Sequence, residues 1–187
     1  MRRLLLTIAL LAGNGPAPAA QVLAFDAVRS RANFEVKVLY LIGVHGEFGT
    51  VHGTLSIDHA RATASVDALI DTNAVHMRNR HYENWTKSAE FFDAQHFPQI
   101  HFVSAPFPLT RLREGGEIDG VLTVRGVNRP VVFTIDPSVC AEPLGGECAV
   151  AADGAIHRSE FGMHSRRGTL ADKVDLRLSI FVRPAPP

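Results

Sequence analysis

"KVDLRLSIFV", residues 173–182, is the stretch that indicates the fold class most directly. Apolar and polar side chains alternate along it, and a period of two predicts a β-strand with one buried face. The apolar set is Val174, Leu176, Leu178, Ile180 and Val182, and the polar set is Asp175, Arg177 and Ser179.

Further strands are predicted upstream of this one. "VLTVRGVNRPVVFTI", residues 121–135, indicates a hairpin joined at "GVNR", with Pro130 opening the second strand. "SVDALID" alternates in the same way, and "NFEVKVLY", "EFGTVHGTLSID" and "QIHFVSAPF" are other strand candidates. Glycines at 43, 46, 49 and 53 suggest bends or bulges where the sheet curls.

One segment, about residues 74–92, has a helical period instead. Met77, His81, Trp85, Ser88 and Phe92 recur at spacings of three and four, with Thr72 and Asn73 as candidate N-caps. His81 shares this face, so we expect it to be at least partly buried. About eight antiparallel strands with glycine bends and one helix predict a closed all-β barrel, which holds either its own side chains or one small ligand.

Charge and motif content exclude several classes of function. The net charge is zero at pH 7, so no basic excess is available for nucleic acid. The 9 histidines show no spacing typical of metal ligands, and no nucleophile elbow or phosphate loop is present. We therefore expect no metal site, no cofactor and no catalytic residues.

The N-terminus has the order of a secretory signal peptide. "MRR" is followed by a short apolar run and "NGPAPAA", with cleavage expected after Ala19 or Ala20, which leaves residues 21–187 as one domain. The apolar run is too short for a membrane span. Export would place Cys140 and Cys148 in an oxidising compartment, where a disulfide across "AEPLGGE" is expected.

Several segments, taken together, resemble one family. "HYENWTKSAEFFDAQHFPQIHF" (81–102), "GVLTVRGVNRPVVFTI" (120–135), "HRSEFGM" (157–163) and "ADKVDLRLSI" (171–180) are similar to motifs of the YceI-like proteins, which are secreted bacterial polyisoprenoid-binding proteins. "SRANFEV" and "GEFG" resemble its first strands. The residues on the first motif are His81, Ser88, Phe91, Phe92, Asp93, Pro98, Ile100 and Phe102.

The resemblance implies an extended lipocalin-like antiparallel barrel that holds an isoprenoid chain, such as that of a quinone or prenyl phosphate. The chain departs from the family at Arg29, Val38, His157 and Glu160, which affects the ligand's head group more than its tail. The candidate ligand-binding residues are Phe34, Val36, Val66, Ile70, His81, Trp85, Phe91, Phe92, Ile100, Phe102, Leu122, Phe133, Phe161, Leu178 and Ile180.

We therefore expect a periplasmic, non-catalytic binding protein for transport, storage or stress response, with an isoprenoid lipid as partner and a homodimer left open. Two alternatives remain. The first is a stress-response module whose barrel is filled by its own side chains. The second is a periplasmic enzyme acting on a lipid, with His81, Arg158 and Asp93 as candidate groups.

Overall fold

The computed structural model describes residues 20–138, 144 and 147–185, which form one curled antiparallel sheet and two short helices. The expected all-β, lipocalin-like fold class is confirmed. The strands are β1 (Gln21–Phe25), β2 (Arg31–Val38), β3 (Ile42–Phe48), β4 (Val51–Asp58), β5 (Thr63–Asp71), β6 (Val75–Met77), β7 (Gln99–Ser104), β8 (Phe107–Pro108), β9 (Gly116–Val124), β10 (Val127–Ile135), β11 (Val150–His157), β12 (Leu170–Ile180) and β13 (Val182–Pro184). The helices are α1 (Arg80–Lys87) and α2 (Arg111–Glu114), with 3₁₀ turns η1 (Thr72–Ala74) and η2 (Arg158–Phe161).

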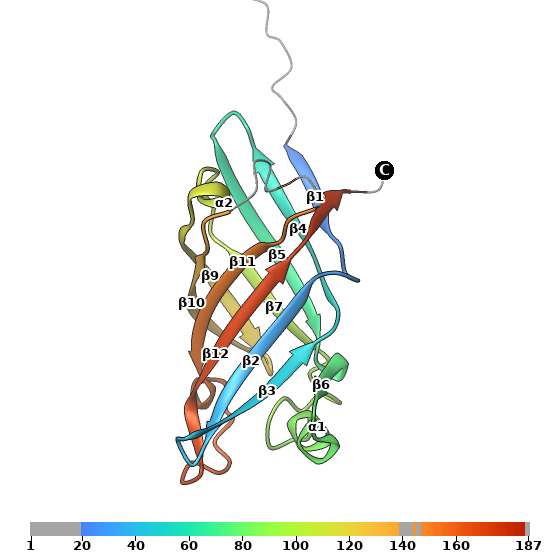
Figure 1. Ribbon diagram of the computed structural model, residues 1–187, viewed down its shortest axis with the longest axis vertical. Coiled ribbons are helices and arrows are strands. Elements are labelled where there is room, and N and C mark those ends of the chain that lie inside the picture. The colour runs from blue at the N-terminus through green and yellow to red at the C-terminus, as the bar shows by residue number, and fades with distance from the viewer. Residues whose placement is uncertain (1–19, 139–143, 145–146, 186–187) are drawn as a thin grey trace, which may run out of the picture.

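The sheet curls until its first strands meet the end of β12. Its strand order is β13-β1-β4-β5-β7-β9-β10-β11-β12-β2-β3-β6, with β8 paired to β5. Because β13 continues β12 after the single residue Phe181, the pairing of β1 with β13 joins one end of this order to its middle. Figure 1 shows the resulting elongated body, with α2 near its upper end and α1 at its lower end.

A buried serine fixes the point at which the sheet closes. Ser30 is fully buried between β1 and β2; its hydroxyl accepts from the Phe181 N–H at 3.0 Å and donates to the Phe181 carbonyl at 3.3 Å. These bonds satisfy the backbone polar groups at the break between β12 and β13. The break lets the long C-terminal strand pair with β2 along one part and with β1 along the other.

The predicted hairpin exists, but its turn lies earlier than expected. Val124 pairs with Val127, so the turn is Arg125–Gly126, and both residues have positive φ, as hairpin turns that match strand twist require. Pro130 does not open β10, as predicted, but lies inside it opposite Val121. Proline is tolerated there because β11 pairs with β10 only from Phe133 to Ile135.

The helix predicted over residues 74–92 is much shorter. Residues Val75–Met77 form β6 instead, because they pair with Phe48, Glu47 and Gly46 of β3. The N-cap of α1 is Asn79, whose side chain accepts from the N–H groups of His81 and Tyr82, and the helix ends at the C-cap Ser88. Phe91 and Phe92 therefore lie beyond the helix rather than on it.

The number of strands exceeds the predicted eight or so, because the sheet includes short segments such as β6, β8 and β13. The second helix, α2, was also not predicted; it has only four residues, too few for a helical period to appear. Across the described part of the chain, none of the helices combines the length and apolar character needed to cross a membrane.

Candidate functional site

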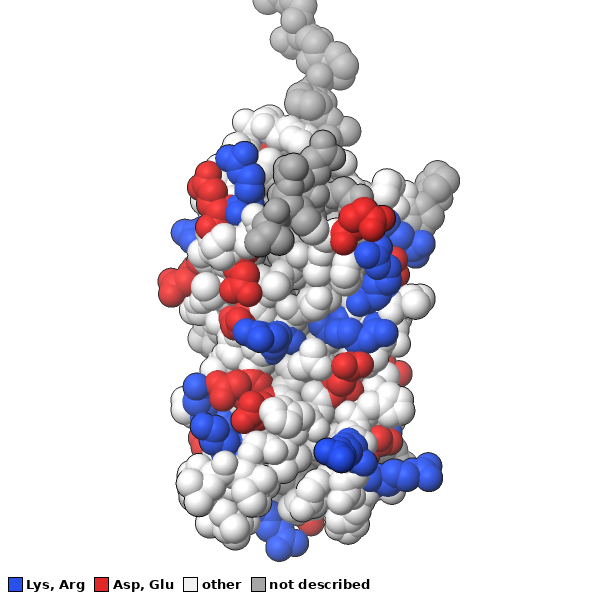
Figure 2. All heavy atoms as spheres, viewed as in Figure 1, with Lys and Arg blue, Asp and Glu red and all other residues white. Residues whose placement is uncertain are grey.

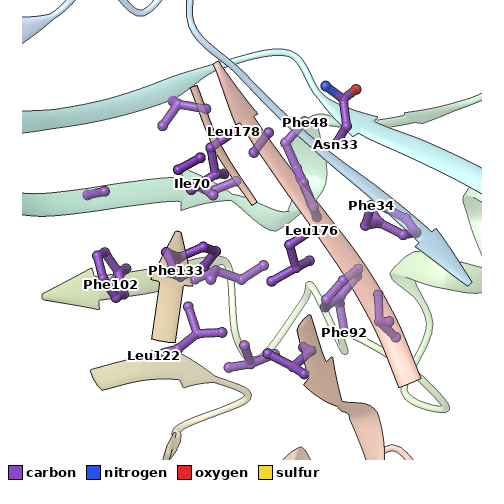
Figure 3. Close-up of a pocket in the computed structure, with 18 of the residues that line it drawn as sticks. Asn33, Phe34, Phe48, Ile70, Phe92, Phe102, Leu122, Phe133, Leu176 and Leu178 are labelled. Carbon is purple, nitrogen blue, oxygen red and sulfur yellow. The ribbon is translucent and has the colours of Figure 1, made fainter. Parts of the chain in front are cut away.

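An internal cavity of about 260 Å³ follows the axis of the barrel. Its wall draws on most strands and extends from Leu112 of α2 at one end to Trp85 of α1 at the other. Figure 3 shows inward-pointing apolar side chains, including Phe48, Ile70, Phe102, Phe133 and Leu178; Asn33 points away from them. The cavity therefore has a hydrocarbon lining over most of its length.

The inner face of β12 indicates that the barrel is hollow. Val174, Leu176, Leu178 and Ile180 occupy the apolar positions of this strand, yet each is only half-buried. The strand has neighbours on both sides, β11 and β2, so it is not an edge. Because these side chains line the cavity, we attribute their remaining exposure to the internal space itself.

Three glycines give room to three phenylalanine rings in the wall. A Cβ at Gly154 would lie 2.6 Å from the Phe133 ring, and Cβ atoms at Gly46 and Gly120 would collide with the rings of Phe34 and Phe102. None of these glycines has positive φ, so the need is for space rather than for backbone freedom. The rings can lie against the neighbouring strands instead of across the cavity, an arrangement known from aromatic residues that cover glycines in sheets.

Aromatic side chains gather where the cavity reaches α1. The Phe92 ring lies edge-on to Phe34 and Phe48, with ring centroids 6.2 and 5.5 Å apart. Trp85 and Phe91 form a second edge-to-face pair at 4.9 Å. Arg125 fixes the segment that carries Phe91, because its guanidinium donates to the carbonyls of Ala89 and Phe91.

The cavity meets solvent at this same end. Of the residues that line it, Tyr82, Arg166 and Thr169 are the exposed ones; they come from α1 and from the loop that leads into β12. The Arg166 guanidinium lies 5.2 Å from the Trp85 ring centre, within cation–π range. At the opposite end the lining residues, such as Phe107, Leu112 and Ile135, are buried. We call the Tyr82–Arg166–Thr169 end the mouth of the cavity.

Arg158 secures the segment beside the mouth. It is 2 % exposed, and its guanidinium donates to the carbonyls of Ala171, Met163 and Leu170 at 2.9, 2.6 and 3.1 Å. Burial lowers the pKa of this guanidinium, although the carboxylate of Asp172 opposes the shift. Through these three hydrogen bonds, Arg158 joins η2 to the start of β12, which indicates a structural role for its side chain.

The carboxylate of Asp172 completes this junction. It accepts from the backbone N–H and the hydroxyl of Ser159 at 2.9 and 2.8 Å. Burial tends to raise the pKa of Asp172, but the hydrogen bonds from Ser159 outweigh it, with smaller contributions from His157 and Arg158. The net pKa is lowered, so the carboxylate is ionised at neutral pH.

Most of the predicted site residues lie at the cavity wall. Two do not: Phe161 is buried in η2 outside the lining, and His81 is exposed on α1, so its expected partial burial is wrong. His81 lies in the first turn of α1, where its side chain is exposed, and Tyr82 and Trp85 of the same helix line the cavity instead. The lining residues that were predicted are Phe34, Val36, Val66, Ile70, Trp85, Phe91, Phe92, Ile100, Phe102, Leu122, Phe133, Leu178 and Ile180.

The structure gives separate partners to the three groups considered for catalysis. Arg158 donates to backbone carbonyl oxygens. The Asp93 carboxylate lies 2.8 Å from the His96 ring nitrogen Nδ1, and the His81 ring lies beside the Tyr82 ring. No three His, Cys, Asp or Glu side chains within residues 20–138, 144 and 147–185 are placed to hold a metal ion. Residues 1–19 of the predicted signal peptide and Cys140 fall outside the described residues, so the leader and the Cys140–Cys148 disulfide stay predictions.

Sequence reasoning missed the residues of the mouth. Tyr82 lies three residues before Trp85 on the same helix, a spacing that places both on one helical face. Arg166 and Thr169 lie in a loop with no periodic pattern, where the sequence carries no signal for their position.

Comparison with known proteins agrees with this geometry. The model of the YceI-like domain matches residues 23–182, which include every strand from β2 to β12. The chain belongs to the YceI-like family. Protein YceI of Salmonella newport is 30% identical over 155 residues, covering 79% of this chain and 78% of the relative, and Protein YceI of Salmonella arizonae matches equally well.

Solved structures share the YceI-like fold at lower identity. BcnA of Burkholderia cenocepacia superposes with a TM-score of 0.69 at 23% identity, covering 85% of this chain and 99% of BcnA. A polyisoprenoid binding domain from Saccharophagus degradans, implicated in plant cell wall breakdown, gives 0.64 at 12% identity over 89% of this chain and all of that domain, 100%. The YCEI protein of Campylobacter jejuni gives 0.61 at 23% identity, covering 81% and 90%.

Proposed function

We propose that this protein is a periplasmic, non-catalytic carrier that holds the chain of an isoprenoid lipid in the barrel cavity. The observation that carries the proposal is an apolar cavity whose exposed lining residues all lie at one end. A ligand that fits this shape has a long hydrocarbon tail and one polar end. The domain from Saccharophagus degradans, which shares the fold, is a polyisoprenoid binding domain and supports the choice of tail.

The tail would bind through loss of apolar surface from water. An isoprenoid chain offers no hydrogen bonds, so affinity depends on burial at about 0.8 kcal/mol for each methylene-sized group. Ten such groups would contribute about 8 kcal/mol before the cost of association. The half-buried β12 side chains Leu176, Leu178 and Ile180 provide wall area that a tail would cover.

The polar end would lie at the mouth. Tyr82 brings a hydroxyl group from α1, and Arg166 brings a cation from the opposite loop. These groups suit either a quinone oxygen or a phosphate, because both accept hydrogen bonds. The leader pattern in residues 1–20 supports export, and transport or storage of the lipid would follow from reversible binding.

The test is to extract the purified protein with organic solvent and identify released lipids by mass spectrometry. We expect an isoprenoid in the wild-type extract, and an isoprenoid added to delipidated protein should raise the melting temperature. If none co-purifies and none raises the melting temperature, the proposal is wrong. Recovery of straight-chain lipids alone would reject the isoprenoid while keeping a lipid ligand.

A matched pair of variants ties binding to the cavity. Leu178→Trp adds bulk inside the wall, where the paired residues Ala152 and Ala32 are small. Val132→Trp makes a tryptophan on the outer face of β10, where the side chain is 46% exposed. We expect Leu178→Trp to reduce lipid recovery roughly tenfold through lost cavity volume, and Val132→Trp to leave it unchanged.

A further inference from the structure

The β2–β3 hairpin ends in four consecutive exposed apolar side chains. Leu39, Tyr40, Leu41 and Ile42 are 56%, 61%, 86% and 61% exposed, and we call them the hairpin tip. Figure 2 shows an uncharged surface at the lower left of the molecule, where this hairpin turns in Figure 1. Single exposed apolar residues are ordinary on protein surfaces, but a contiguous group indicates an interaction site.

The tip is held in a defined position. The Leu39 N–H donates to the Thr169 carbonyl at 2.6 Å, and the Tyr40 hydroxyl donates to the Arg167 carbonyl at 3.2 Å. Leu39 and Tyr40 both have left-handed backbone, with φ of 50° and 60°, a conformation that glycine or asparagine adopts more easily. Large apolar residues at these positions oppose local backbone preference, which indicates that their side chains serve another purpose.

Basic residues surround the tip without opposing charge nearby in sequence. Lys37 precedes it, and Arg166 and Arg167 lie on the loop to which it is bonded; all three are exposed. Neither residues 36–46 nor residues 161–171 contain an Asp or Glu. Four acidic groups border these ranges: Glu35 lies 3.8 Å from His45, Glu47 pairs with Arg31, Asp172 binds Ser159, and Glu160 is exposed on η2.

The hairpin tip lies at the end of the barrel that carries the mouth. It is bonded to the loop that supplies Arg166 and Thr169, and Arg166 in turn lies over Trp85 of α1. Any surface that covers the tip therefore approaches the opening of the cavity.

We propose that the hairpin tip inserts into the interfacial layer of an anionic phospholipid bilayer and sets the mouth against the membrane. Apolar side chains that project from a basic surround are the combination that interfacial binding uses. A projecting turn of four residues is small for a stable protein–protein interface, which buries about 800 Å² on each partner. The purpose of docking rests on the proposed lipid carriage, but docking itself does not require an isoprenoid.

The experiment is flotation of the purified chain with vesicles that contain no isoprenoid. Vesicles of phosphatidylethanolamine with phosphatidylglycerol should carry the protein upward, and those of phosphatidylcholine alone should carry less. Raising the salt concentration should weaken binding, because it screens the contribution of Lys37, Arg166 and Arg167. A wild-type protein that fails to float with anionic vesicles overturns the proposal, whether or not it carries an isoprenoid.

Variants separate the tip from the rest of the surface. The double change Leu41→Ser and Ile42→Ser should lower vesicle partitioning about tenfold, since two apolar side chains no longer insert. Val28→Ser is the control, because Val28 is 80% exposed in the β1–β2 connection, away from the tip. Melting temperatures verify that both variants fold.

Two results would show that the hairpin tip does not insert into the membrane. If the tip variant floats as well as the wild type, another surface binds the vesicles and the proposal fails. If the wild type self-associates in sedimentation and the tip variant is monomeric without any change in flotation, the tip is a contact between copies. A lipid extract measured in parallel reports on the carrier function independently of both results.

Discussion

Gly154→Ala tests the idea that glycines keep aromatic rings along the wall. The added Cβ would lie 2.6 and 2.7 Å from two atoms of the Phe133 ring, where carbon atoms in contact are separated by about 3.5–4.0 Å. The ring must therefore move by roughly 1 Å. Phe102 packs edge-on against it at 5.1 Å, so the open direction is into the cavity.

The expected loss of stability combines two opposing effects. Overpacking costs about 1–3 kcal/mol, and replacing glycine by alanine within a strand returns about 0.5–1 kcal/mol of backbone entropy. These ranges leave a net destabilisation of about 0–2.5 kcal/mol, centred near 1 kcal/mol, which should lower the melting temperature of the delipidated protein by about 2–4 °C. Calorimetry or circular dichroism measures this directly.

Gly49→Ala is the matched control, because a Cβ at Gly49 meets nothing within 4 Å. It should leave the melting temperature unchanged or slightly raised. Phe133→Leu should reduce the effect of Gly154→Ala in a double-mutant cycle, since the colliding ring atoms are gone. If Gly154→Ala is as stable as Gly49→Ala, or if the two changes at 133 and 154 add without coupling, the steric reasoning is wrong.

Three other predictions concern the mouth and its supports. Arg158→Met should destabilise the fold by about 2–4 kcal/mol in urea unfolding, because three buried carbonyls lose their donor; an unchanged midpoint would contradict the structural role. The lowered pKa of Asp172 means that its stabilisation is present above pH about 3.9 and is lost as pH falls through the lower folded value, so the stability difference between wild type and Asp172→Asn should shrink in that acidic range. Trp85 is the single tryptophan, so binding of an isoprenoid should change its fluorescence; a constant spectrum while mass spectrometry shows bound lipid would place the ligand elsewhere.

Strand periodicity predicted which side chains face inward. Ile100 and Phe102 are buried on the inner face of β7, and Leu178 lines the cavity as its alternation indicated. Side chains alternate between the two faces of an extended strand, and this depends only on the local backbone. The alternation therefore predicts the buried side chains correctly wherever one face of the sheet packs against the interior. The same pattern could not distinguish a hollow barrel from a filled one, because identical side chains either line a space or fill it.

The helix limits show where local pattern misleads. Met77 and His81 are four residues apart, which fits a helix, but Met77 pairs with Gly46 of β3, a contact remote in sequence. Asn79 is the stronger cap in the folded chain because its side chain reaches two free N–H groups. Arg166 joins the mouth through the same kind of remote contact, across the barrel end to Trp85.

The buried end of the cavity near α2 has a consequence for the tail length of the proposed ligand. Among the described residues, the lining is buried at the α2 end, at Phe107, Leu112 and Ile135, and exposed at the mouth, so the distance between these two ends sets a depth. With the proposed isoprenoid ligand, a chain shorter than this depth would leave wall uncovered, and a longer one would leave isoprene units in water. If the protein carries a lipid as proposed, the position of the buried end would decide which tail length binds best.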